Sequence, residues 1–263
     1  MRSLPAGATG ILGRYLDALS FLSRLVTRPG QSEERFRACL SAFAPAGLTL
    51  GLVWAGAALA ALTVARAARV PAPLAELLAG WIWLLALLWT TRGLHWDGVA
   101  DLADACGSGA TGDRFWQILR DSRLGAFGGM ALCAGLAGAL LLAAAHAAKG
   151  QWLPLVLAPA WGRCCSLMLA AAAPAQGGGN LGRLVCGAMT PRRARGQQGL
   201  LGGMLLLSWL AGLPAGRVLL LAAGQYFLHI CLRRTALAHG GLSGDFLGTS
   251  IETAQLWFLL AAL

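Results

Sequence analysis

The stretch APLAELLAGWIWLLALLWTT, residues 72–91, decides the fold class of this sequence. It holds one charged residue, Glu76, and roughly 20 mostly apolar residues are what an α-helix needs to cross a bilayer. Comparable runs lie near 44–65, 126–148, 152–174, 199–215 and 216–232, and a last run, 253–263, is roughly half a span long. We therefore expect an all-α, polytopic transmembrane bundle of about six to seven spans, with a tight turn at Leu213-Pro214.

The composition of the 263-residue chain also indicates a membrane protein. The chain is 57% hydrophobic and 12% charged, whereas soluble domains carry about 25% charged residues. The net charge of +10 suggests nucleic acid at first, but the basic residues lie between the apolar runs and form no stripe on one face. We expect one integral-membrane domain, residues 1–263, with membrane lipid around it and no nucleic-acid partner. The sequence leaves open whether the chain forms a homo-oligomer.

The basic residues also predict the orientation. Most of the 21 Lys and Arg residues precede the first span or lie in alternate connections between spans. Lys and Arg in short connections stay on the cytoplasmic side, so the N-terminus and the segments after residues 91, 174 and 232 are expected there. Segment 1–37 is too polar to span, but apolar residues at steps of three and four over 11–25 predict an amphipathic helix on the membrane or against the bundle.

Three aspartates form the first candidate site. Asp97, Asp101 and Asp104 are spaced i, i+4, i+7, which places them within about 60° on one helix face. Three carboxylates on one face repel each other unless a cation compensates them, and Asp oxygens suit Mg²⁺. A solvated acidic face is the simpler alternative. The apolar flanks of the segment place it near the bilayer, where ionisable residues are usually functional, so we expect a magnesium site in a cytoplasmic loop region.

A second acidic pair, Asp245 and Glu252, has the same i, i+7 spacing and is expected in another cytoplasmic loop. It follows the run GGLSG, residues 240–244, whose flexible backbone amides are suited to approach a phosphate. The pair therefore makes Asp245 a fourth candidate metal ligand and Glu252 a candidate catalytic acid, with Gly244 as a phosphate contact.

Arginines supply the candidate phosphate contacts. Arg123 is suited to clamp phosphate oxygens bidentately, although an arginine that anchors a helix end is an equal alternative. Arg163 lies inside a span, so it must face the interior and find a carboxylate or a phosphate. His95, next to the aspartates, could serve as a base or donor, but a lone histidine is more often structural. The candidate phosphate-binding set is Arg114, Arg123, Arg163, Asp121, Ser122, His95 and Gly244.

Three motifs in chain order resemble the cobalamin synthase family, adenosylcobinamide-GDP ribazoletransferase. They are GLHWDGVADLADACG (93–107), DSRLGAFG (121–128) and GGLSGDFLGTSIE (240–252), and the resemblance extends back to FLSRL (21–25) through FAPAG (43–47). The departures are modest: Trp96, Leu102, Ala105-Cys106 and Ile251 stand where the family usually has other residues.

The resemblance implies a Mg²⁺-dependent transferase of the bacterial inner membrane. Such an enzyme joins adenosylcobinamide-GDP to α-ribazole or its 5′-phosphate, releases GMP and forms adenosylcobalamin or its phosphate. On this hypothesis Asp97, Asp101 and Asp104 hold metal on the diphosphate, with Asp245 or Glu252 contributing. One acid accepts the hydroxyl proton, and the arginines neutralise phosphate charge.

Two other classes compete with this prediction. Phosphoalcohol transferases of the CDP-alcohol type also align aspartates on membrane helices, but Asp101 stands where their Ala-Arg pair would follow the first Asp-Gly. A transporter would place carboxylates at mid-membrane in several spans, whereas these acids are expected in two cytoplasmic segments.

Overall fold

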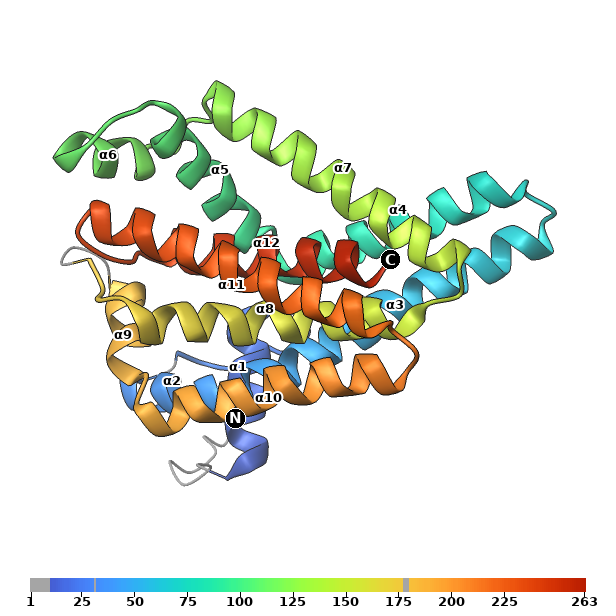
Figure 1. Cartoon of the computed structure of the whole chain (residues 1–263), viewed down its shortest axis with the longest axis horizontal. Helices are drawn as coiled ribbons and strands as arrows, with labels where there is room; N and C mark the ends of the chain where they lie inside the picture. Colours follow the sequence, from blue (N-terminus) through green and yellow to red (C-terminus); the bar gives the residue numbers. More distant parts are fainter. Residues whose placement is uncertain (1–9, 31, 177–179) are drawn as a thin grey trace.

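The computed structural model describes residues 10–30, 32–176 and 180–263, and these residues are mostly helical (Figure 1). The helices, in chain order, are α1 (Ile11–Leu22), α2 (Glu33–Cys39), the 3₁₀ helix η1 (Leu40–Ala42), α3 (Phe43–Ala67), α4 (Ala72–Thr91), α5 (Leu94–Gly107), α6 (Gly112–Leu119), α7 (Ala126–Ala148), α8 (Trp152–Ala172), α9 (Asn180–Ala188), α10 (Pro191–Leu210), α11 (Ala215–Ala238) and α12 (Gly244–Ala262). The prediction of an all-α polytopic bundle is confirmed.

Five of the described helical segments are long and apolar enough to cross a membrane: Glu33–Ala67, α4, α7, α8 and α11. The other two apolar runs that the sequence predicts to lie in the membrane belong to α10 and α12. The predicted span 199–215 is the apolar half of α10, whose other half begins with a run of arginines. The run 253–263 is continued by the residues before it, because residues 253–262 form the second half of α12.

The connections alternate between the two ends of the bundle (Figure 1). One end holds α6, α9, the start of α10 and the junction of α11 with α12. The other end holds the turn between α3 and α4, the turn after α7 and the turn at Leu213-Pro214, where α10 ends at Leu210 and α11 starts at Ala215. The segments that the sequence predicts to be cytoplasmic thus gather at a single end.

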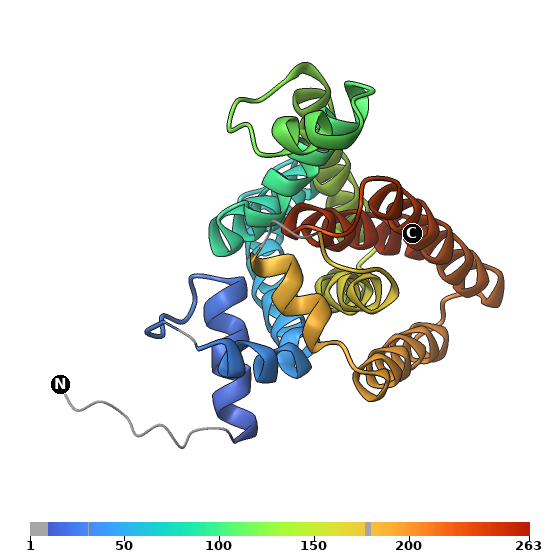
Figure 2. The same cartoon turned by 90° about the vertical axis from the view of Figure 1, so that its left-hand side faces the viewer.

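Helix α8 lies at the centre of the bundle, as the end-on view in Figure 2 shows. It packs against α3 on one side and α12 on another, and Trp161 and Phe258 are buried between them. The approach of α3 is close because Gly47 has no side chain: a Cβ there would lie 2.7 Å from the Ala160 Cα. Small residues permit this separation between membrane helices.

The expected N-terminal amphipathic helix is confirmed as α1, which lies against α2 and α3. Its apolar side buries Leu19 and Leu22. Asp17 is also buried, and it pairs with Arg28 at 2.9 Å and Arg35 at 2.7 Å, which joins α1 to the start of α2. The first nine residues of the predicted N-terminal segment lie outside the described part of the chain.

Candidate active site

Helix α5 carries the three aspartates of the first motif, so their predicted common helix is confirmed. The chain bends between α4 and α5 at Arg92 and Gly93, which have φ values of 60° and 66°. After this bend α5 packs against both α12 and α7. The expectation of catalytic loops was wrong, because the acids of both motifs lie on helices, α5 and α12.

The two acidic motifs meet where α5 crosses the start of α12. Gly98 permits the contact, since a Cβ at that position would lie 2.8 Å from the Asp245 Cα. The Thr249 hydroxyl donates a hydrogen bond to the Gly98 carbonyl oxygen at 3.0 Å and fixes the crossing. The crossing therefore brings Asp245 to the aspartates of α5, although more than 140 residues separate them in the chain.

Charge repulsion in this acidic crossing is strong. Burial, followed by the nearby charges of Asp97, Asp245 and Asp104, raises the pKa of Asp101 to about 7. Burial is also the main cause that raises the pKa of Asp245, and the Asp97 charge adds to it. Ionised carboxylates at such a position are stabilised by a positive charge placed among them.

Among the described residues, no group of three or more Asp, Glu, His or Cys side chains is placed so that it could hold a metal ion by itself. The donor set still fits Mg²⁺, which is usually held by one or two carboxylates together with substrate phosphates. Asp97, Asp101 and Asp245 offer hard oxygen ligands and mutual repulsion that a divalent cation would relieve.

Asp104 differs from its neighbours because both of its oxygens already accept backbone hydrogen bonds. The Gly125 and Gly128 amides donate to Oδ2 and Oδ1, each at 2.8 Å. These amides belong to the start of α7, so Asp104 caps that helix, where a negative charge is favourable. Each carboxylate oxygen keeps a second lone pair, and metal ligation by Asp104 stays a prediction.

Two pockets flank the acidic face. A small one, of about 130 Å³, is lined by His95, Asp97, Gly244 and Asp245 together with apolar side chains of α1, α3, α8 and α9. A wider and more open one, of about 380 Å³, is lined by Asp101 and Asp104 together with Asp121 and Arg123. The acidic stripe of α5 thus faces one partly apolar pocket and one polar pocket.

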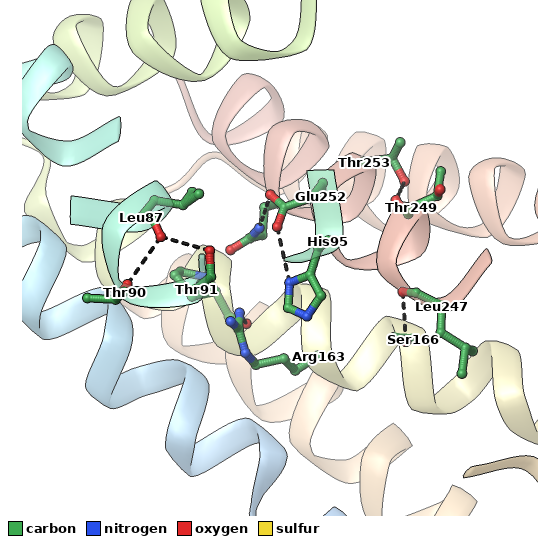
Figure 3. Close-up of polar contacts among 12 residues, drawn as sticks. Leu87, Thr90, Thr91, His95, Arg163, Ser166, Leu247, Thr249, Glu252 and Thr253 are labelled. Carbon is green, nitrogen blue, oxygen red and sulfur yellow. Dashed lines mark hydrogen bonds and ion pairs between the residues drawn. The ribbon is translucent and has the colours of Figure 1, made fainter. Parts of the chain in front are cut away.

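Glu252, the second acid of α12, lies beneath these pockets in a buried polar network (Figure 3). It accepts a hydrogen bond from Gln255 Nε2 at 2.7 Å and lies 3.3 Å from His95 Nδ1. Neither flanking pocket is lined by Glu252. Its position favours a structural role toward His95 over direct contact with a substrate.

Arg163 faces the interior, as the sequence predicted, and is fully buried. Its Nη1 donates to the Pro159 carbonyl oxygen at 2.7 Å, and its guanidinium lies 6.0 Å from the centre of the Trp54 ring. Figure 3 shows it below Glu252 and His95. Such depth sets it apart from the two flanking pockets, so its position does not support the predicted phosphate contact.

The motif DSRLGAFG, residues 121–128, supplies an exposed ion pair at the rim of the wider pocket. Arg123 lies 2.6 Å from Asp121, and its hydrogen bonds lower the pKa of Asp121 to about 2. Ser122 is exposed between them. Arg114 lies on α6 and donates to Gln117 at 3.2 Å, outside the pocket lining that contains Arg123. The structure therefore brings Arg123 to the pocket rim, whereas Arg114 lies outside the pocket lining, although its charge also lowers the pKa of Asp121.

Three of the five backbone amides of the glycine-rich run already donate hydrogen bonds within the protein. The amides of Gly240, Gly241 and Leu242 donate to the carbonyl oxygens of Leu237, Ala236 and Pro174, respectively. Residue 244 is the first residue of α12 and lines the small pocket, as expected for a phosphate contact.

Two residues near the site escaped the sequence analysis. The Ser243 hydroxyl donates to Asp245 Oδ2 at 2.9 Å. Arg120 partly offsets the burial that raises the pKa of Asp245, and its guanidinium lies 6.0 Å from the centre of the Trp116 ring. Both stand beside motif residues in the chain, but only the crossing of α5 and α12 shows that they share one site.

Comparisons with known proteins agree with the order of the motifs. The family model described as cobalamin-5-phosphate synthase matches residues 14–263. An adenosylcobinamide-GDP ribazoletransferase of Nitratidesulfovibrio vulgaris (strain DP4) is 39% identical over 256 residues, covering 95% of this chain and 97% of that protein. One from Klebsiella pneumoniae (strain 342) is 35% identical over 260 residues, covering 95% and 98%. No solved structure matches the chain.

Proposed function

The chain belongs to the cobalamin-5-phosphate synthase family, and we propose that it is an adenosylcobinamide-GDP ribazoletransferase acting in assembly of the cobalamin nucleotide loop. We further propose that it depends on Mg²⁺ and accepts α-ribazole or its 5′-phosphate. The observation that carries the magnesium proposal is the cluster of Asp97, Asp101 and Asp245 at the crossing of α5 and α12. Family membership sets aside the CDP-alcohol transferase and the transporter.

The reaction is a phosphoryl-centred exchange. The ribazole hydroxyl oxygen forms a bond to the phosphorus that bears the cobinamide, and the bond from that phosphorus to the bridging oxygen breaks. GMP leaves with the bridging oxygen, and the hydroxyl proton passes to a carboxylate of the site. Positioning and charge neutralisation supply most of the rate enhancement in such a transfer.

The residues at the crossing of α5 and α12 have different roles in this reaction. One or two of the carboxylates of Asp97, Asp101 and Asp245, together with the substrate phosphates, would hold Mg²⁺, which when bound neutralises charge on the diphosphate. Arg123, at the rim of the polar pocket, is placed to pair with phosphate oxygens once it exchanges Asp121 for them. The apolar lining of the small pocket, with Phe21 and Phe43, suits the aromatic base of ribazole.

The location of the site supports a cytoplasmic reaction. The acids lie at the end of the bundle that gathers the basic segments, and both nucleotide-bearing substrates are soluble at their polar ends. We propose that this end faces the cytoplasm at a bacterial inner membrane.

The test is release of GMP by the purified chain in detergent, supplied with both substrates and Mg²⁺. Asp101→Asn should lower the rate of GMP release by about a thousandfold or more, because it removes a charge from the metal site. Asp113→Asn is the matched control, since Asp113 is an exposed acid on α6, and it should keep the wild-type rate. Normal turnover by the Asp101→Asn variant would remove Asp101 from the site.

A further inference from the structure

A groove of about 330 Å³ lies between α8, α10 and α11, on a side of the bundle away from the acidic crossing. Its floor is formed by Trp161, Cys165 and Met168 of α8, and its walls by side chains of α10 and α11. Figure 2 shows α10 and α11 on the outer side of the central helix α8. The groove therefore opens sideways, toward the surrounding lipid.

The groove contains polar groups although it lies among membrane helices. Gln198 projects into it from α10, and Gln225 and His229 project from α11. The Trp161 indole donates to Gln225 Oε1 at 3.0 Å, which leaves the Gln225 amide nitrogen as a further donor. Polar side chains at membrane depth are costly and usually mark a binding site.

Along both α10 and α11, the side chains on the groove face change in the same order from charged to polar to apolar. On α10, Arg195, Gln198, Leu201 and Leu205 follow one another at steps of three and four, so they share one face. On α11, Arg233, His229, Gln225 and Ala222 do the same in the opposite chain direction. From the end of the bundle inward, each helix presents a guanidinium, then an amide or imidazole about 4.5–6 Å deeper, then apolar side chains.

Arg195 and Arg233 do not line the groove but lie one helical turn beyond the lining residues Gln198 and His229, and both have donors to spare. Arg233 donates through Nε to the Ala172 carbonyl oxygen at 2.9 Å, and Arg195 donates through Nε to the Pro191 carbonyl oxygen at 3.4 Å. Their terminal nitrogens make no hydrogen bond with any residue that the structure describes. A fork of two N–H groups matches the oxygens of a phosphate.

We propose that this groove binds one anionic phospholipid of the leaflet next to the basic end of the bundle. The phosphate lies at Arg195 and Arg233, the ester carbonyls lie at the level of Gln198 and His229, and one acyl chain runs along the apolar part of the groove. The order of charged, polar and apolar groups along the two helices is the order of those groups in a phospholipid. A second copy of the chain fits less well, because a two-fold contact would place the same arginines opposite each other.

The experiment is native mass spectrometry of the full chain in detergent, after removal of endogenous lipid and addition of phosphatidylglycerol or phosphatidylcholine. The wild-type chain should retain phosphatidylglycerol preferentially. The double variant Arg195→Gln/Arg233→Gln should bind it about thirtyfold more weakly, since each arginine near an anionic lipid contributes a factor of about five. The matched control, Arg14→Gln/Arg37→Gln, removes two exposed arginines outside the groove and should bind as the wild type does.

A second variant tests the apolar part without changing charge. Ala222→Phe fills the groove where the acyl chain lies, so it should lose phosphatidylglycerol while its melting temperature without lipid stays at the wild-type value. Equal retention of the two lipids by the wild type would overturn the proposal. So would an equal loss in the control pair, or a concentration-dependent dimer that phosphatidylglycerol does not dissociate.

Discussion

Asp245 and Glu252 lie two turns apart on the same helix, yet they serve different regions of the molecule. Asp245 is at the first turn of α12 and lines a pocket beside Asp97. Glu252 is buried among His95, Gln255 and Arg163. The i, i+7 spacing places the two acids on the same face of α12, but it does not determine how deeply each is buried. Asp245, near the start of the helix, is accessible to a ligand, whereas the buried Glu252 contacts other helices of the bundle.

The largest effect is expected from a substitution of Glu252 in its buried polar surroundings. Glu252→Gln leaves the Arg163 guanidinium without its nearby carboxylate, and an uncompensated buried charge costs about 3 kcal/mol or more. We expect a large drop in the melting temperature of the purified chain.

The double variant Glu252→Gln/Arg163→Gln is its control. It removes both charges together and should recover much of the lost stability, because the cost lies in the unpaired charge. Equal melting temperatures for the Glu252→Gln variant and the wild type would show that Glu252 and Arg163 do not stabilise each other.

The close contact between α5 and α12 can be disrupted by a substitution that leaves every acidic residue in place. Gly98→Ala adds a Cβ that would lie 2.8 Å from the Asp245 Cα, so α5 and α12 must separate. A displacement of about 1 Å can lower a rate about a hundredfold, and we expect GMP release to fall by that order. Gly138→Ala on α7, where nothing lies within 4 Å of the added atom, is the control and should keep wild-type activity. Unchanged activity of the Gly98→Ala variant would mean that the close crossing is not needed.

A substitution at the accessible acidic crossing is expected to have a smaller effect, and it should stabilise the folded chain instead of destabilising it. Burial and neighbouring carboxylates raise the pKa of Asp101 to about 7 in the folded chain. Its contribution to stability is therefore fully present below the ordinary pKa of an aspartate and is lost as the pH rises through about 7.

Without Mg²⁺, Asp101→Asn should thus stabilise the chain at pH 8 relative to the wild type, and the gain should vanish near pH 4. The gain should be on the order of 1–2 kcal/mol, since the carboxylate is only partly buried. Thermal unfolding at both pH values measures it. A variant less stable than the wild type at pH 8 would contradict the repulsion among these acids.

The sequence predicted the helical bundle, the shared face of Asp97, Asp101 and Asp104, and the inward-facing Arg163, because these follow from apolar length, helical periodicity and the cost of charge in lipid. It also grouped Asp245 with these aspartates as a candidate metal ligand, but it did not predict the close contact at Gly98 that brings α12 against α5. It also could not separate Glu252 from Asp245, since burial depth depends on the packing of α12 against α8. The contacts of Ser243 and Arg120 with Asp245 could not be predicted from the sequence either, because they too depend on how the helices pack.

The most direct test of the account is the dependence of GMP release on Mg²⁺ for the wild type and for Asp245→Asn. The account predicts no release by the wild type in EDTA, restoration at saturating Mg²⁺, and a Mg²⁺ requirement at least about tenfold higher for the variant, because one carboxylate of the metal site is lost. Undiminished release by the wild type in EDTA would contradict the central claim that the acids of α5 and α12 act by holding a divalent cation.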